Sequence, residues 1–253
     1  MFNSKHNRKI DFIVGGVQKS GTSALNKYLR LHPDIGMPTK KKELHFFYNE
    51  KIFSKKINYS SYTKSFDFSS NKKIYGEVTP IYIFWENSCK RIWEYNKDIK
   101  LIFILRNPIE RAFSQWNMQV DQNREKESFS YCIRNENERI KASLPVQLKR
   151  FSYVNRGFYS EQIRRYKRFF NEEQMFFVKY DYFKNKQEES LRSILNFLGV
   201  DENKFEFQHK TTHQRKKHGV ISLEDKNFLI DKFYFDIKQV EKELGWDCSD
   251  WLQ

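Results

Sequence analysis

The chain has 253 residues, of which 39% are hydrophobic and 17% aromatic, which excludes disorder and leaves enough apolar mass for one α/β domain. Its formal net charge of +14 suits an anionic ligand such as a nucleotide, a glycan or nucleic acid. Lysine is abundant along the whole chain, however, so a solvated basic surface is the better explanation for most of this charge.

Cysteine spacing and the N-terminal residues bear on the cellular compartment. Cys89, Cys132 and Cys248 lie far apart without C-x-x-C spacing, which favours free thiols in a reducing compartment over a disulfide framework or a zinc site. The opening residues MFNSKHNRKIDF lack an apolar core of signal-peptide length, and no apolar run is long enough to span a bilayer. We therefore expect a cytoplasmic protein with no membrane partner. Since no repeat or low-complexity linker interrupts the chain, we expect a single domain over residues 1–253.

The first strong signal is a strand, a loop and a helix over residues 11–31. The apolar residues 12–14 predict a buried strand, and Leu25, Tyr28 and Leu29 recur at helical spacing after the loop. In such a unit the N–H groups of the loop and of the helix N-terminus point at an anion, so the pattern predicts a phosphate-binding site.

The loop departs from a nucleotide-binding P-loop, which reads G-x-x-x-x-G-K-[ST]. Gly16 and Gly21 have the required spacing, but Thr22 stands at the lysine position. Lys19 lies two residues before the second glycine instead, while Thr22 or Ser23 can still meet a phosphate oxygen. A loop that merely turns a strand into a helix is the alternative, because short glycine motifs are common.

The motif Lys19-Ser20-Gly21-Thr22-Ser23 resembles the 5′-phosphosulfate loop of sulfotransferases that use 3′-phosphoadenosine 5′-phosphosulfate (PAPS), whose lysine is also displaced upstream. The resemblance implies a P-loop-like three-layer α/β fold with a central parallel β-sheet flanked by helices. It also implies that Lys19 neutralises charge on the bridging oxygen and the sulfuryl group. Thr22, Ser23 and the loop N–H groups would hold the 5′-phosphate, and Ser20 and Gly21 complete this donor-binding set.

Residues 37–47, MPTKKKELHFF, predict an extended aromatic stretch. The K-E-L-H-F-F part resembles the K-E-x-H-F-F signature of the glycan-type, heparan-sulfate-like branch of that family. The resemblance implies that Glu43 is the candidate general base at the acceptor, with His45 second. A carboxylate beside Lys42 ordinarily titrates low and needs partial burial to become a useful base. A surface ion pair between Glu43 and a neighbouring lysine is the alternative.

Residues 74–80 are strand-like and end at a proline, and residues 83–95 predict an amphipathic helix. Sulfotransferases often have a lysine after the glutamate here, in an E-K-[ST]-P pattern. Val78 follows Glu77 in this chain, which weakens a direct acceptor role for the segment.

The second strong signal covers residues 100–118. The apolar run 101–105 predicts a buried parallel strand. Asn107 is expected to cap the following helix, with a proline at its first position and Glu110 completing a capping-box-like pair. Arg106 then leaves the carboxyl end of the strand and Ser114 lies on the helix, which suits a second phosphate at the ligand-binding edge of the sheet.

This stretch is similar to the 3′-phosphate motif of sulfotransferases, R-[ND]-P-x-x-R-x-x-S. The resemblance implies that Arg106 and Ser114 bind the 3′-phosphate, whereas Arg111 matches a basic position that is usually structural. Arginine suits a doubly charged phosphate because its planar fork donates twice. An ion pair at the strand end is the alternative for Arg106.

Two further segments resemble the family. Residues 156–162, RGFYSEQ, resemble an R-G-x-Y-x-x-Q/H-L segment, in which Tyr159 either contacts the cofactor or packs to seat a helix. Residues 210–219 form the densest basic loop, and the resemblance implies that it closes over the 3′-phosphate and adenine through Arg215, Lys216 and Lys217. A mobile charged loop without that role is the alternative. The rest of the sequence predicts a charged helix over 119–148 and a buried strand over 175–180. It also predicts helical segments over 190–198 and 223–244.

Taken together, the motifs imply a PAPS-dependent sulfotransferase that acts on a hydroxyl or amine of a small-molecule or glycan acceptor and releases 3′,5′-ADP. We expect no metal, because the sequence shows no carboxylate-rich metal site, and no nucleic-acid partner. The acceptor, O- versus N-sulfation, the choice between Glu43 and His45 as the base, and the oligomeric state stay open.

Two other functions remain as alternatives. A P-loop kinase would use ATP and magnesium, but the displaced Lys19 disfavours it. A non-catalytic binder of nucleic acid or anionic glycan would rely on the net charge. Its salt-sensitive binding would survive Lys19→Ala, because many lysines would share the ligand.

Overall fold

The computed structural model describes residues 8–144, 150–207 and 218–253. It divides into two compact units, the first made of residues up to 105 and 165–211, and the second of residues 106–164 and 212–253. The single-domain count stays a prediction, and each unit is described below by itself.

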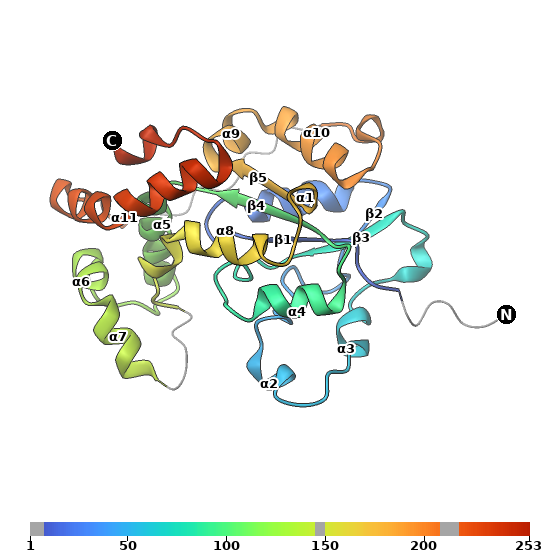
Figure 1. Ribbon diagram of the computed structural model, residues 1–253, viewed down its shortest axis with the longest axis horizontal. Helices are drawn as coiled ribbons and strands as arrows, with labels where there is room; N and C mark the ends of the chain where they lie inside the picture. The colour runs from blue at the N-terminus through green and yellow to red at the C-terminus, as the bar shows by residue number, and fades with distance from the viewer. Residues whose placement is uncertain (1–7, 145–149, 208–217) are drawn as a thin grey trace. The chain divides into compact units, whose positions relative to one another are not determined.

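The first unit is built on a five-stranded parallel sheet in the order β2-β3-β1-β4-β5 (Figure 1). The fully buried β1 lies in the middle, so the chain winds outward from it in both directions. The carboxyl end of β1 is therefore the switch point at which parallel α/β sheets bind ligands. The strands are β1 (Phe12–Gly16), β2 (Ile35–Gly36), β3 (Ile74–Val78), β4 (Lys100–Leu105) and β5 (Met175–Lys179).

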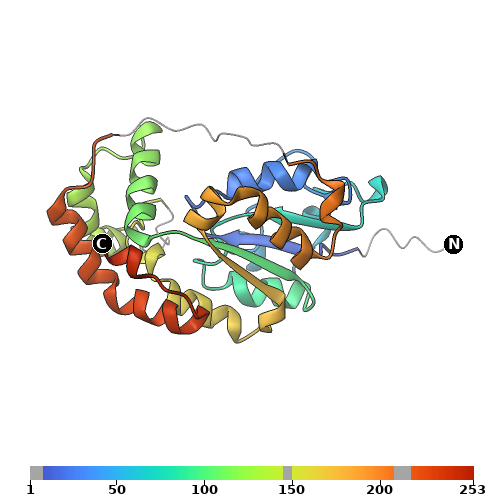
Figure 2. The ribbon, with the colours of Figure 1, turned by 90° about the horizontal axis from the view of Figure 1, so that it is seen from above.

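Helices cover both faces of this sheet and make the expected three layers. Figure 2 shows α1 (Thr22–Leu31) and α10 (Gln187–Leu198) over one face and α4 (Ser88–Tyr95) over the other. Alternating strand residues such as Val14 and Ile102 pack in one buried cluster with Leu25 of α1 and Ile194 of α10. The prediction of a parallel sheet flanked by helices is confirmed.

Short elements fill the segments without clear periodicity, namely α2 (Glu50–Phe53), α3 (Ser60–Thr63) and α9 (Tyr180–Asn185). Residues 37–47 contain no strand. The helix predicted from residue 83 begins only at Ser88, because turns close the preceding backbone, for example from the Trp85 N–H to the Ile81 carbonyl. The short strand β2 was missed, since two residues carry no period.

Helices dominate the second unit. Asn107 caps α5 (Pro108–Asp121) as predicted, because its Oδ1 accepts from the Ile109 N–H at 2.9 Å. The predicted capping-box role of Glu110 is wrong, since its carboxylate accepts from the Arg106 guanidinium instead. The charged helix expected over 119–148 is broken into the end of α5, α6 (Phe129–Arg134) and α7 (Glu136–Ser143).

The long helix α11 (Leu223–Leu244) ends at Gly245, whose φ of 67° is the left-handed conformation predicted for a terminating glycine. Asp236 of α11 also caps the start of α8 (Tyr159–Lys167). Its carboxylate accepts from the Tyr159 N–H at 2.8 Å and from the Ser160 hydroxyl at 2.6 Å.

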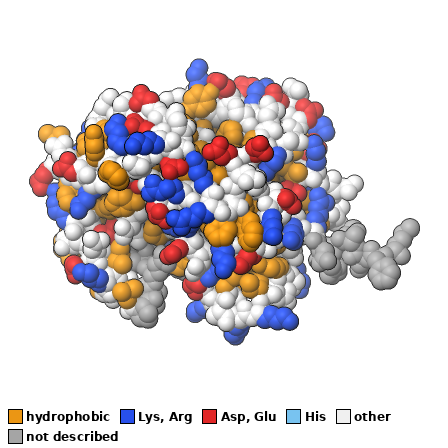
Figure 3. Space-filling model, in the orientation of Figure 1, with side chains coloured by type: hydrophobic (Ala, Val, Ile, Leu, Met, Phe, Trp, Pro, Cys, Tyr) orange, Lys and Arg blue, Asp and Glu red, His pale blue; other side chains and the backbone are white. Residues whose placement is uncertain are grey.

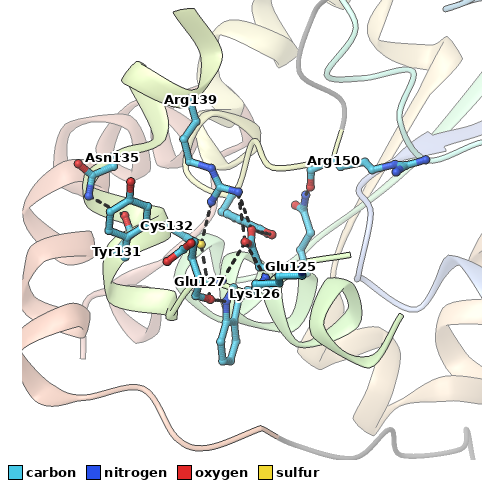
Figure 4. Close-up of polar contacts among 11 residues, drawn as sticks. Glu125, Lys126, Glu127, Tyr131, Cys132, Asn135, Arg139 and Arg150 are labelled. Carbon is cyan, nitrogen blue, oxygen red and sulfur yellow. Dashed lines mark hydrogen bonds and ion pairs between the residues drawn. The ribbon is translucent and has the colours of Figure 1, made fainter. Parts of the chain in front are cut away.

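A buried ion pair joins α7 to the segment that follows α5. Figure 4 shows the Arg139 guanidinium directed at Glu125, with a 2.9 Å contact, and at the Cys132 sulfur. Tyr153 donates a further hydrogen bond to Glu125 at 2.8 Å. Burial alone would raise the pKa of Glu125, but the donors from Tyr153, the Glu127 N–H and Arg139 outweigh it and hold that pKa below its ordinary value.

Replacing Arg139 with methionine is expected to reduce the free energy of unfolding by about 3 kcal/mol at neutral pH, because it leaves a buried carboxylate unpaired. A carboxylate whose pKa is lowered by folding stabilises the fold at pH values above its unfolded-state pKa. This stabilisation is lost as the pH falls through the folded-state pKa. The loss caused by Arg139→Met should therefore shrink below about pH 4. Urea unfolding of the wild type and of Arg139→Met, at neutral pH and below about pH 4, measures this loss of stability.

Lys141→Met is the matched control on the same helix, because Lys141 forms an exposed ion pair with Glu138. Such a surface pair contributes less than about 1 kcal/mol. An equal loss in both variants, or one for Arg139→Met that does not depend on pH, would contradict the assignment.

Candidate active site

The loop that follows β1 turns sharply into α1. The register between β1 and β4 shifts between Val14 and Gly16, which marks a bulge at the start of the loop. A Cβ on Gly16 would lie only 2.4 Å from the Ile83 side chain, so this position requires glycine. The loop packs directly on the sheet, and the Val17 N–H donates to the Ile104 carbonyl at 2.9 Å.

Two residues of the loop are left-handed. Lys19 has a φ of 77° and Gly21 a φ of 82°. For a residue with a Cβ this conformation costs about 1 kcal/mol, and such outliers cluster at ligand-binding sites. Gly21 is also the N-cap of α1 and carries no capping side chain, which leaves the N–H groups of the first helical turn facing an incoming anion.

The three hydroxyl residues of the motif differ in their surroundings. Ser20 is fully buried and donates to the Val17 carbonyl at 2.5 Å, so its side chain braces the loop and only its backbone can face the donor. Thr22 is buried at the start of α1. Ser23 is exposed, and its Oγ accepts from the Lys42 ammonium at 2.6 Å.

The candidate bases lie together next to that lysine. Lys42 also contacts Glu43, with its Nζ 3.0 Å from Oε1, and His45 Nε2 lies 3.6 Å from the other carboxylate oxygen. The Glu43 side chain is 28% exposed, which is the partial burial that a general base needs. The ion pair considered as an alternative is thus present, and through Lys42 it links Glu43 to Ser23 at the start of α1. Sequence spacing gave no sign of this link.

The predicted 3′-phosphate residues belong to the second unit. Arg106 directly follows β4, and its guanidinium donates to Glu110 at 2.8 Å, so a phosphate must share or displace that carboxylate. Ser114 lies partly buried on α5. Arg111 is fully buried and donates to Gln115 and the Tyr153 carbonyl, which agrees with a structural role.

Tyr159 is a buried residue that contacts the backbone of Arg106. It is fully buried, and its hydroxyl donates to the Arg106 carbonyl at 2.9 Å. Burial raises the pKa of Tyr159, so the hydroxyl stays protonated. The observed contact holds the Arg106 backbone, and a contact with the cofactor stays a prediction.

Arg215, Lys216 and Lys217 lie outside the described residues. His218, the next described residue, is anchored on α5: its N–H donates to Asn117 Oδ1 at 2.6 Å, and its Nε2 lies 2.5 Å from Asp121 Oδ1. Asn117 is one turn beyond Ser114 on α5. The role of these three basic residues at the 3′-phosphate stays a prediction.

The described ranges also bear on metal binding and on membrane insertion. They contain no group of three or more His, Cys, Asp or Glu side chains that could hold a metal ion. Within the same residues, no helix combines the length and apolar character needed to cross a membrane. All three cysteines are buried thiols, and burial raises the pKa of Cys89 and of Cys132 to about 12.

Comparison with known proteins gives consistent matches. A family model described as "Sulfotransferase domain" matches residues 9–230. Heparan sulfate glucosamine 3-O-sulfotransferase 5 of Mus musculus and of Homo sapiens are each 30% identical over 188 residues, which cover 74% of this chain and 53% of the relative. The membrane-associated sulfotransferase kil1 of Dictyostelium discoideum is 36% identical over 44% of this chain and 23% of its own length. The chain thus spans about half the length of the first of these relatives.

Solved structures agree with this match. The sulfotransferase from Alicyclobacillus acidocaldarius superimposes with a TM-score of 0.83 at 27% identity, covering 97% of this chain and 100% of its own. Mouse sulfotransferase SULT7A1, complexed with PAP, shares the fold with a TM-score of 0.50 at 21% identity, over 77% of this chain and 59% of its own. These likenesses confirm the predicted P-loop-like fold. The chain belongs to the family of proteins that have a sulfotransferase domain.

Proposed function

We propose that this chain is an enzyme that transfers a sulfuryl group from PAPS to a hydroxyl or amine of a glycan or small-molecule acceptor. The observation that carries the proposal is the loop at the switch point of the sheet, where the left-handed Lys19 and Gly21 lead into an uncapped helix. A loop of this form binds an anion through its N–H groups. Family membership supports sulfate as the group transferred.

Each charged end of the donor has a set of candidate residues with suitable chemistry. Lys19, the N–H groups of Thr22 and Ser23, and the Ser23 hydroxyl suit the 5′-phosphosulfate. Arg106 and Ser114 suit the 3′-phosphate, which ATP lacks. An acceptor oxygen or nitrogen would attack sulfur as the bond from sulfur to the bridging oxygen breaks, and 3′,5′-ADP would leave. Lys19 would neutralise the charge that develops on the bridging oxygen, and Glu43 would take the acceptor proton.

A glycan with acidic groups is the acceptor class that we favour. Lys40 and Lys41 are exposed and Lys42 is partly exposed, directly before Glu43, so three cations flank the candidate base. The relatives that match this chain include enzymes named for heparan sulfate glucosamine. A cytoplasmic location and the absence of a metal remain part of the proposal.

The two alternative functions are less well supported. A kinase would bring its lysine to the start of the helix, where this chain has Thr22, and the family match favours sulfuryl transfer. A non-catalytic polyanion binder would concentrate its charge. Figure 3 instead shows Lys and Arg side chains interspersed with acidic ones on the face in view.

Calorimetric titration with 3′,5′-ADP, 5′-AMP, ADP and ATP, without magnesium, tests the donor site. We expect the wild type to prefer 3′,5′-ADP. Arg106→Ala should weaken that ligand ten- to a hundredfold and leave 5′-AMP unchanged, since a hydrogen bond to a charged group contributes about 1.5–3 kcal/mol. Equal or tighter binding of ATP would refute the proposal and favour the kinase.

Arg192→Ala is the matched control for this titration. Arg192 forms an ion pair with Glu188 at the same i,i+4 spacing and the same N–O distance range as Arg106 with Glu110, but on α10. It should leave the binding of every nucleotide unchanged.

A further inference from the structure

A buried carboxylate lies one strand away from the phosphate loop. Glu77 is the penultimate residue of β3, is paired in register with Ile13 of β1, and is 0% exposed. Three of its contacts are hydroxyl groups, namely Tyr62 at 2.7 Å and Tyr82 at 3.1 Å on Oε1, and Thr79 at 2.6 Å on Oε2; the Leu44 N–H is a further donor to this carboxylate. No lysine or arginine of the described residues pairs with it. A buried carboxylate without a cation is uncommon enough to require an explanation.

Two of these hydroxyls also hold the segment that carries the candidate bases. The Leu44 N–H donates to Thr79 Oγ1 at 3.2 Å, and the N–H groups of Phe46 and Phe47 donate to Tyr82 Oη at 3.0 and 3.4 Å. Residues 43–46 form neither helix nor strand, so no backbone ladder fixes them. Side-chain oxygens therefore hold backbone N–H groups of residues 44–47, which include His45 and directly follow Glu43. The rings of Phe46 and Phe47 are buried against Tyr62 and Tyr82.

The carboxylate sets the direction of these hydrogen bonds. A backbone N–H can only donate, so the hydroxyl oxygens of Thr79 and Tyr82 must accept from the segment and send their own protons elsewhere. The acceptor that receives both protons is Glu77. An amide at position 77 would offer a donor on one side and leave one hydroxyl proton, or one backbone N–H, without an acceptor.

We propose that Glu77 is a positioning residue for sulfuryl transfer, which holds residues 44–47 through the hydroxyls of Thr79 and Tyr82 and thereby sets the location of Glu43 and His45. This inference rests on the proposed function for its catalytic meaning. Neither the motif spacing nor the comparisons assign a role to Glu77. The same turn reaches the phosphate loop, because the Ile83 N–H donates to the Gly15 carbonyl at 3.0 Å.

The control for the test is also in the structure. Tyr62 is as buried as Tyr82 and donates to the same carboxylate oxygen, but its hydroxyl makes no bond to residues 44–47. Tyr62→Phe therefore removes a hydrogen bond of the same kind without releasing the segment. Thr79→Val and Tyr82→Phe each remove a hydroxyl acceptor of the segment while keeping side-chain shape, and Glu77→Gln replaces one acceptor oxygen with a donor.

The experiment compares the ring resonance of His45 in protein labelled at histidine, with a His45→Gln spectrum for assignment. Thr79→Val, Tyr82→Phe and Glu77→Gln should each move this resonance by more than its linewidth, whereas Tyr62→Phe should leave it in place. The affinity for 3′,5′-ADP should stay unchanged in all four, which shows that the phosphate loop is intact. Transfer from radiolabelled PAPS to heparan sulfate should fall about tenfold in kcat in the first three, with an unchanged KM for PAPS.

The outcomes separate the two proposals. A His45 resonance that does not move in Thr79→Val and Tyr82→Phe, or that moves equally in Tyr62→Phe, refutes the positioning role whatever the activity. A wild type that does not prefer 3′,5′-ADP refutes the proposed function, while the histidine spectra still decide whether Glu77 fixes the segment. If Glu77→Gln fails to fold, the Thr79 and Tyr82 variants still decide it.

Discussion

Replacing Lys19 with methionine should lower turnover about a thousandfold while 3′,5′-ADP still binds, because an electrostatic stabiliser of the transition state is removed. Lys19 lies in the loop between β1 and α1 in a left-handed conformation, with a φ of 77°. Methionine keeps the Cβ and most of the stem, so the backbone strain of this position is the same in both proteins. The lost charge is then the main difference.

Steady-state transfer of sulfate from PAPS and calorimetric binding of 3′,5′-ADP measure the two effects separately. The product lacks the sulfuryl group, so its affinity should fall far less than kcat if Lys19 acts on the developing charge. Lys90→Met is the control for the loss of one positive charge, because Lys90 is an exposed lysine of α4. A Lys19→Met enzyme with normal turnover would show that the loop binds an anion without taking part in transfer.

The sequence predicts strands and helices best where an apolar run ends at a turn signal. Residues 12–14 and 101–105 are long enough to be recognised as buried strands, and each is followed by a turn signal that starts a helix. Gly245 ends α11 at the predicted position, because a left-handed residue there satisfies the last carbonyls. The two strand-to-helix junctions that carry the predicted donor residues could therefore be placed from local pattern alone.

Contacts between distant segments could not be predicted in this way. The bond from Lys42 to Ser23 joins residues 19 positions apart, and the burial of Glu77 depends on pairing between β3 and β1. Glu110 illustrates competition between partners, because the strong charge-assisted bond to Arg106 replaces the predicted capping contact. Residues 43–46 have no period, and the hydroxyl acceptors of Leu44 and Phe46 lie 35 and 36 positions further along the chain.

The second large effect is expected on kcat when a candidate general base is replaced. Glu43→Gln should lower kcat by a hundred- to a thousandfold, the range typical of a missing general base, and leave 3′,5′-ADP affinity unchanged. The amide oxygen can still accept from Lys42, whose Nζ lies 3.0 Å from Glu43 Oε1, so the local packing is largely kept. Glu50→Gln is the matched control, since Glu50 is also ion-paired, with Arg91, but lies in α2.

His45→Gln, measured beside Glu43→Gln, decides the assignment. His45 Nε2 lies 3.6 Å from Glu43, so the histidine is close enough to orient the carboxylate or to take the proton itself. A much larger loss in Glu43→Gln makes the carboxylate the base and the histidine its support, whereas the reverse order exchanges the roles. Equal losses that do not add in the double variant identify a coupled pair, because residues that act as a unit are not additive. Full activity in Glu43→Gln would leave Glu43 as a surface ion pair with Lys42.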